Sequence, residues 1–131
     1  MKISELGHAA GCDVQTIRYY EREGLLSEPA RTDSGYRDYG PEHLARLQFI
    51  RHCRALDIPL SEVRQLLDYA RSPKESCQAT NDLLDAHIER VNERIRSLQH
   101  LRRELTALRS CCDGGRDKPC AILASFEATQ S

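Results

Sequence analysis

The sequence is poor in large aromatic residues and in long apolar runs. It contains no tryptophan, one methionine and two phenylalanines. No apolar run approaches the about 20 residues that a membrane-spanning helix needs, and residues 1–6 lack the apolar segment of a secretion signal. These absences predict a cytoplasmic location without membrane association. In that reducing compartment the six cysteines are expected to be thiols or metal ligands rather than disulfides.

A large excess of one charge is also missing. The chain has 19 Lys and Arg residues against 20 Asp and Glu residues, and its net charge is -1 at pH 7. Binding of nucleic acid through a broad basic field is therefore excluded. Any nucleic-acid site must be a local basic patch.

Recognisable catalytic motifs are absent as well. The sequence shows no serine–histidine–aspartate set, no paired-acid arrangement and no glycine-rich phosphate loop. We therefore expect that the protein is not an enzyme.

The part of the chain before Ser72-Pro73 has short segments interrupted by glycine and proline. Asp13 is placed to cap a helix, and Gly24 to end it. The pattern predicts helix, turn, helix, hairpin, helix and helix, with the helices at residues 3–10, 14–23, 41–56 and 61–70 and the hairpin within 25–39. This order is typical of a winged helix-turn-helix.

A long stretch without glycine or proline follows, from Lys74 to Asp113. It predicts one helix of about 50 Å at 1.5 Å per residue. Its apolar residues recur at alternating spacings of four and three, as in a coiled coil; they are Leu84, Ile88, Val91, Ile95 and Leu98, then Leu105 after a miss at Arg102, with Leu101 and Leu108 beside the row. This row needs a partner. We favour a second copy of the chain over packing against the N-terminal part.

Side chains that suit DNA gather on the second predicted helix and on the hairpin. Arginine, threonine and tyrosine donate hydrogen bonds to phosphate oxygens, and arginine can also read guanine. The alternative is that single tyrosines lie at the edge of the core with hydrated hydroxyl groups. The candidate DNA-binding residues are Thr16, Arg18, Tyr19, Tyr20, Arg22, Arg31, Tyr36, Arg37 and Tyr39.

Several segments together resemble the MerR family of regulators. They are Val14 to Glu21, Gly24-Leu25-Leu26, Gly35 to Tyr39, Phe49-Ile50-Arg51 and Ile58 to Val63. The resemblance implies a homodimer joined by an antiparallel coiled coil. It also implies binding of double-stranded promoter DNA, which the dimer bends and untwists for RNA polymerase when an effector binds.

The predicted fold class is therefore mainly α, a winged helix-turn-helix DNA-binding domain with a long C-terminal antiparallel coiled-coil dimerisation helix. The expected domains are residues 1–71 for DNA binding, 72–112 for dimerisation, and 113–131 for a metal-binding loop and a short C-terminal helix.

The cysteines divide into two groups. Cys12 and Cys53 lie within the N-terminal helices and are expected to be structural thiols. Glycine and proline between Cys112 and Cys120 let the chain turn back, so these two can meet. Cys77 cannot reach them along a straight helix, but in an antiparallel pair it meets those of the other subunit. The family resemblance places metal ligands at the same three positions.

Three thiolates suit a soft or borderline heavy-metal ion. The setting of Cys77 and the loop resembles the cadmium- and lead-responsive branch, so we expect activation of heavy-metal resistance or efflux genes by Cd(II) or Pb(II). Zn(II) and Hg(II) stay open, because zinc-responsive members share the adjacent Cys111-Cys112. A fourth ligand could be Cys111, Asp113, Asp117 or water. Another open reading is a redox switch in which Cys112 and Cys120 form a disulfide.

Overall fold

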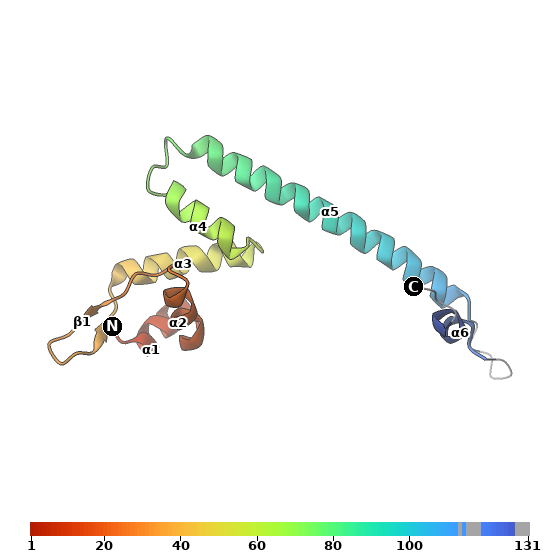
Figure 1. The fold of residues 1–131 in the computed structure, drawn as a ribbon, viewed down its shortest axis with the longest axis horizontal. Helices are drawn as coiled ribbons and strands as arrows, with labels where there is room; N and C mark the ends of the chain where they lie inside the picture. The colour runs from red at the N-terminus through yellow and green to blue at the C-terminus, as the bar shows by residue number, and fades with distance from the viewer. Residues whose placement is uncertain (113, 115–118, 128–131) are drawn as a thin grey trace. The chain divides into compact units, whose positions relative to one another are not determined.

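The protein is described by a computed structural model, which covers residues 1–112, 114 and 119–127. It forms two compact units, Met1–Leu83 and Leu84–Ser131. The described elements, in chain order, are α1 (Ile3–Ala10), α2 (Val14–Arg22), β1 (Ala30–Arg31), β2 (Arg37–Asp38), α3 (Pro41–Ala55), α4 (Leu60–Tyr69), α5 (Cys77–Ser110) and α6 (Ala121–Glu127) (Figure 1). The mainly α class, the helix-turn-helix and the long C-terminal helix are confirmed. No described helix is both long and apolar enough to cross a membrane.

A tight turn joins α1 to α2. The N–H of Cys12 donates to the Gly7 carbonyl at 2.8 Å, and Gly11 adopts the left-handed conformation, with φ 65°, that ends α1. A Cβ atom on Gly7 would lie 2.6 Å from the Cys12 carbonyl oxygen, so the turn leaves room only for glycine. Asp13 occupies the N-cap position of α2 as expected, but its side chain makes no capping hydrogen bond.

The core of the first unit combines all four of its short helices with the chain around the strands. Its fully buried large side chains are Tyr39, Leu6, Ile17, Leu25, Leu47, Ile50, Ile58 and Val63. Burial of one such aliphatic side chain stabilises a fold by roughly 1.5–3 kcal/mol. Leu83 also joins this core, so the first two turns of α5 belong to the N-terminal unit.

The predicted hairpin is present but short. Strands β1 and β2 pair antiparallel, with Ala30 opposite Asp38 and Arg31 opposite Arg37. Gly35 takes a positive φ of 86° in the turn, and its carbonyl accepts a hydrogen bond from the Arg31 guanidinium at 2.9 Å. The hairpin is therefore a small wing beside the helix-turn-helix.

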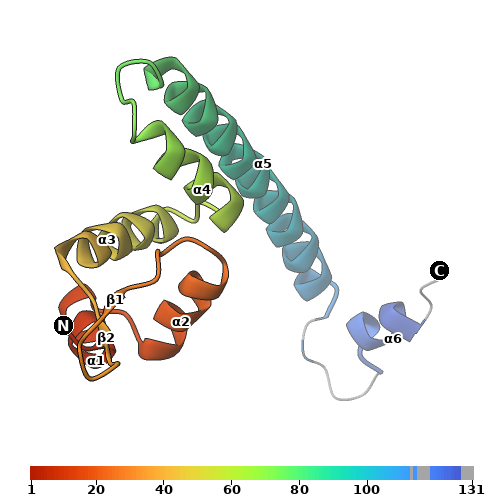
Figure 2. The same ribbon diagram turned by 60° about the vertical axis from the view of Figure 1, so that its left-hand side comes forward.

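The long helix begins three residues later than predicted and ends before Cys111 (Figure 2). Residues 73–76 form turns, and the N–H of Ser76 donates to the Ser72 carbonyl at 3.0 Å. The absence of glycine and proline does not locate the start of α5, because the turn that follows Pro73 also contains no glycine or proline. The start at Cys77 makes this thiol the first helical residue.

Candidate DNA-binding surface and thiol pair

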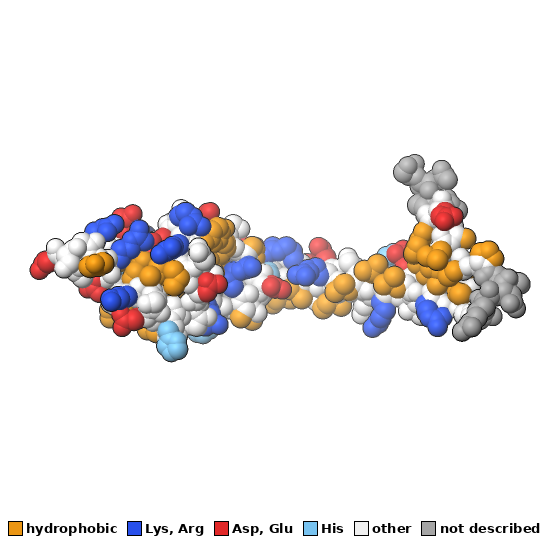
Figure 3. All heavy atoms as spheres, turned by 90° about the horizontal axis from the view of Figure 1, so that it is seen from below, with side chains coloured by type: hydrophobic (Ala, Val, Ile, Leu, Met, Phe, Trp, Pro, Cys, Tyr) orange, Lys and Arg blue, Asp and Glu red, His pale blue; other side chains and the backbone are white. Residues whose placement is uncertain are grey.

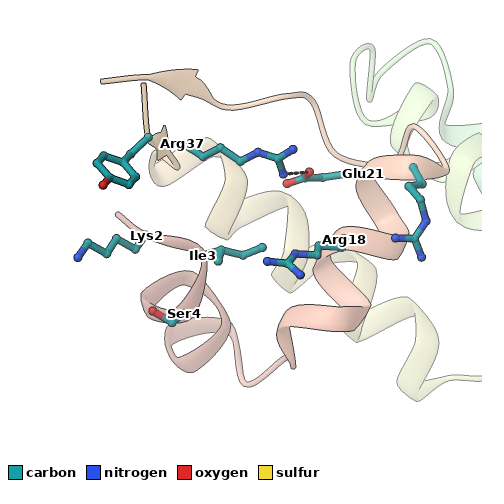
Figure 4. Close-up of a pocket in the computed structure, with 8 residues that line it drawn as sticks. Lys2, Ile3, Ser4, Arg18, Glu21 and Arg37 are labelled. Atoms are coloured by element: carbon teal, nitrogen blue, oxygen red, sulfur yellow. Dashed lines mark hydrogen bonds and ion pairs between the residues drawn. The ribbon is translucent and has the colours of Figure 1, made fainter. Parts of the chain in front are cut away.

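A groove of about 590 Å³ lies where the start of α1, helix α2 and the wing meet (Figure 4). Its walls include one carboxylate and four cationic side chains, which come from three elements; the lining residues are Lys2, Ile3, Ser4, Arg18, Glu21, Arg22, Tyr36 and Arg37. A local surplus of positive charge therefore exists on a protein whose net charge is -1. Such a groove can bind an extended polyanion.

Helix α2 presents its candidate residues according to its helical period. Ile17 and Tyr20 point into the core, which turns Arg18, Tyr19 and Arg22 outward. Tyr19 is 40 % exposed, and the Arg22 guanidinium carbon lies 6.0 Å from the centre of its ring. Thr16 is half-buried. Three adjacent donors on this helix are thus accessible to a ligand.

Glu21 connects the wing to α2. Its carboxylate accepts a hydrogen bond from the Arg37 guanidinium at 2.9 Å (Figure 4). It accepts another from the Tyr39 hydroxyl. The hydrogen bond with Tyr39 and the charge of Glu21 raise the pKa of Arg37. The carboxylate side chain is only 10 % exposed. This largely buried carboxylate therefore links the wing and Tyr39 to α2.

The structure places two of the candidate tyrosines in the core. Tyr20 is 8 % exposed and Tyr39 is 1 % exposed. Burial raises the pKa of both hydroxyl groups, and for Tyr39 the hydrogen bond to Glu21 adds to the increase. Tyr39 also packs edge-on against the ring of His43, with 5.2 Å between ring centres. In this arrangement the two rings support the surface rather than form it.

The remaining wing residues are exposed. Tyr36 keeps 71 % of its surface accessible, and Arg31 and Arg37 both lie on the outside of the two strands. Lys2 and Ser4 complete the groove, but our reading of the sequence missed them. A lone lysine and serine at the start of a helix carry no pattern, and only the packing of α1 beside the wing reveals their position.

The predicted approach of Cys112 to Cys120 is present in the structure. Cys120 directly precedes α6, and its sulfur accepts hydrogen bonds from the backbone N–H groups of Leu123 and Ile122. These bonds, with a further hydrogen bond from the Cys112 thiol, lower the pKa of Cys120. The start of a short helix therefore favours the thiolate form, which is the form that binds metals.

Cys77 lies in the other compact unit, at the first residue of α5. Its thiol is exposed beside a cavity of about 270 Å³ whose walls include Phe49, Leu66, Tyr69 and Pro73. Among the described residues no group of three or more His, Cys, Asp or Glu side chains could hold a metal ion. The described part of one chain therefore supplies a two-thiol site and a separate exposed thiol.

The other cysteines have different surroundings. The Cys111 thiol is exposed and donates to the Ala107 carbonyl at 3.4 Å. Burial raises the pKa of Cys12 and of Cys53, as expected for structural thiols. The possible ligands Asp113 and Asp117 lie outside the described residues.

A helix-turn-helix, a β-wing and a cationic groove between them define the N-terminal unit as a winged helix-turn-helix DNA-binding domain. The comparisons with known proteins agree. Residues 1–70 match the MerR HTH family regulatory protein model, and residues 44–108 match the model described as MerR, DNA binding. The chain belongs to the MerR family, and it is a transcription regulator rather than an enzyme.

Three relatives illustrate the similarity. The HTH-type transcriptional regulator ZntR homolog of Haemophilus influenzae is 46 % identical, over 94 % of this chain and 91 % of its own. The lead(II) complex of PbrR691 from Ralstonia metallidurans has a TM-score of 0.87 and 49 % identity, with 96 % of this chain and 98 % of that chain covered. The mercury(II) complex of MerR from Bacillus megaterium has a TM-score of 0.71 and 31 % identity, with 97 % and 99 % covered.

Proposed function

We propose that the protein is a cytoplasmic, metal-responsive regulator that binds promoter DNA as a homodimer. Binding of Cd(II) or Pb(II) by cysteine thiolates makes the dimer activate heavy-metal resistance or efflux genes through RNA polymerase at the promoter. In this proposal, residues 1–71 bind DNA, residues 72–112 form the dimer, and residues 113–131 supply the loop and short helix of the metal site.

The observation that carries this proposal is the contact between Cys112 and Cys120. Two sulfurs in hydrogen-bonding contact, one of them with a lowered pKa, form a donor set that prefers soft ions. The metal ligands are Cys112 and Cys120 of one subunit and Cys77 of the other. A heavy-metal ion bound there would link the two subunits. Its ligands among the described residues would be the three thiolates and no carboxylate.

The exposed row on α5 supports the dimer. Leu98, Ile88 and Leu105 are 61 %, 56 % and 56 % exposed in the single chain, and Figure 3 shows hydrophobic side chains exposed along this helix. So much apolar surface on one helix indicates a protein partner. Antiparallel pairing with a second copy would cover the row and bring Cys77 of one subunit near the thiol pair of the other.

DNA contact is assigned to exposed side chains. On α2 and the wing these are Arg18, Tyr19, Arg22, Arg31, Tyr36 and Arg37, together with the half-buried Thr16, and the groove adds Lys2 and Ser4. Tyr20 and Tyr39 act beneath this surface as supports. Their burial leaves little surface for a phosphate.

Cd(II) and Pb(II) are favoured as the inducing ions. A thiolate site without histidine suits these ions, and the lead(II) complex is a relative of 49 % identity over nearly the whole chain. The mercury(II) complex and the ZntR homolog keep Hg(II) and Zn(II) as alternatives. An induction profile of a promoter reporter across Cd(II), Pb(II), Zn(II) and Hg(II) ranks them directly.

The test of the metal site uses four cysteine variants. Cys77→Ser, Cys112→Ser and Cys120→Ser should each abolish tight Cd(II) and Pb(II) binding and reporter induction. Cys111→Ser is the matched control, because its thiol points to its own helix. Full metal sensing by Cys77→Ser would contradict a site shared between subunits.

DNA binding is tested separately with Arg18→Ala. Loss of one exposed guanidinium should weaken promoter binding and leave metal affinity nearly unchanged, since Arg18 and the thiol pair lie in different units. A mobility-shift titration and a metal titration on the same preparation measure both. Unchanged promoter affinity would remove the groove from the DNA interface.

The contact between Cys112 and Cys120 also fits a second function, a thiol redox switch. An oxidant would take two electrons from the two thiols, and a disulfide would form with release of two protons. If the reporter responds to a mild oxidant such as a peroxide but not to metals, the redox function replaces the metal function.

A further inference from the structure

Three pairs of apolar residues on α5 are symmetric about the peptide bond between Arg94 and Ile95, whereas Ile95 itself has Arg94 as its mirror position. Leu84 lies as far before this centre as Leu105 lies after it, and the same holds for Ile88 with Leu101 and for Val91 with Leu98. All six side chains are exposed in the single chain. In an antiparallel pair with a two-fold axis at this centre, each of these three pairs therefore gives layers that combine two apolar side chains.

The thiols obey the same symmetry. Cys77 and Cys112 are equally far from the Arg94–Ile95 centre, although neither belongs to the apolar row. The register that matches the row thus brings Cys77 level with Cys112 of the partner subunit. Two independent features of the chain select one alignment, whereas a shift of either helix by one turn would place Arg102 against an apolar residue.

Two opposite charges lie near the two ends of the row. Asp85 follows Leu84, and Arg102 follows Leu101. In this register, Asp85 of one subunit and Arg102 of the other lie between the same two apolar layers, and Arg102 occupies the position at which the 4-3 spacing of the apolar row has its gap.

These two charges are available for such a pair. Within the described part of its own chain, neither Asp85 nor Arg102 forms a salt bridge. The neighbouring charges are already used, with Arg96 3.3 Å from Glu89 and His100 3.0 Å from Glu104. Both side chains can therefore pair with a charge on another molecule.

We propose that Asp85 of each subunit pairs with Arg102 of the partner subunit, and that these two pairs fix the register of the α5 dimer. The inference rests on the proposed homodimer and specifies how its two helices align. The partner is a second copy of this chain, because the apolar symmetry and the opposite charges complement themselves.

Asp85→Arg and Arg102→Asp, purified separately and then mixed, test the pairing in the full-length protein. Each variant alone puts like charges together twice, so its dimer dissociation constant should rise about tenfold over that of the wild type. In the mixed dimer both positions again join an arginine to an aspartate. Sedimentation velocity and native mass spectrometry should show a 1:1 heterodimer with near wild-type affinity.

Arg103→Asp provides the matched control, since it changes the same charge one residue away, on a position turned from the row. Mixed with Asp85→Arg, it should restore affinity only in part, because the introduced arginine still faces Arg102 at one of the two positions and only the other position keeps the native pair. Equal rescue by both mixtures would show that only net charge matters and would overturn the pairing. If the wild type is a dimer and the mixture of Asp85→Arg and Arg102→Asp gives no rescue, the pairing is wrong but the proposed homodimer stands. If the wild type is a monomer at micromolar concentration, the proposed homodimer itself is wrong.

Discussion

The two compact units differ in where their apolar side chains lie. In Met1–Leu83, Leu6, Ile17 and Leu47 have no exposed surface, whereas in Leu84–Ser131 Leu98 is 61 % exposed and Phe126 57 % exposed. The first unit buries most of its large apolar side chains within the chain, whereas the second leaves most of its own exposed, which indicates a partner. The DNA-binding surface is therefore formed by one chain, whereas we expect the sensing site to be completed by two.

The largest expected effect separates these two kinds of leucine. Leu47→Ala should lower the free energy of unfolding of the N-terminal unit by about 2–5 kcal/mol, because it leaves a cavity in a packed core. Leu98→Ala should leave that unfolding free energy nearly unchanged and should weaken dimerisation. Denaturant unfolding of both variants at low protein concentration, with sedimentation as the second measurement, makes the comparison. An equal loss of unfolding free energy in Leu47→Ala and Leu98→Ala would contradict this difference between buried and exposed leucines.

The next effect concerns the turn that orients α2. Gly7→Ala places a methyl group 2.6 Å from the Cys12 carbonyl oxygen, and backbone cannot move aside as a flexible side chain can. We expect a loss of about 1–3 kcal/mol in stability and weaker promoter binding. Ala9→Ser, on the exposed side of α1, is the control. Thermal unfolding measures both, and wild-type stability of Gly7→Ala would show that the turn has more room than the structure gives it.

A smaller effect is expected from Glu21→Gln. Removal of a negative charge from the groove should strengthen binding to any DNA, while loss of the ion pair with Arg37 should loosen the wing. The two changes together should lower the ratio of promoter affinity to random-DNA affinity by a few-fold. Parallel titrations with the two DNAs measure this ratio. An unchanged ratio would mean that Glu21 does not position the wing.

The smallest effect is the pH dependence of the thiol pair. Because the pKa of Cys120 is below its usual 9.0, alkylation of this thiol should stay fast at a pH where an ordinary cysteine has slowed. Because the pKa of Cys120 is lowered in the folded protein, its thiolate stabilises the folded state. This contribution to the free energy of unfolding is fully present above pH 9.0 and is lost as the pH falls through the lower pKa of the folded state. Mass spectrometry measures the alkylation rate of Cys120 in the wild type and in Ile122→Pro. This substitution removes one of the backbone N–H groups that donate to the Cys120 sulfur. Unchanged rates in that variant would show that the Ile122 N–H does not contribute to the lowered pKa.

Much of the fold was predictable because its signals are local. Glycine at the end of α1 and after α2, proline at the start of α3 and the spacing of leucines on α5 located the elements to within a few residues. The start of α5 was placed three residues too early, because the turn before Cys77 contains residues that also suit helices.

The candidate site was less predictable. Tyr19 and Tyr20 are neighbours in sequence, but only one is accessible, and the burial of Tyr39 depends on residues that are distant along the chain. The Lys2 contribution to the groove and the bridge from Glu21 to Arg37 depend on the same packing. Sequence patterns carry no direct record of such long-range contacts.

The sequence by itself determined the order of helices, the symmetric apolar row and the spacing of the cysteines, since each depends on neighbours within a few turns of chain. Only the tertiary structure decided which cations share a groove, which tyrosines are buried and how Cys120 meets both Cys112 and the start of α6. These features depend on which segments pack together, and packing responds to the shape and charge of the whole folded unit.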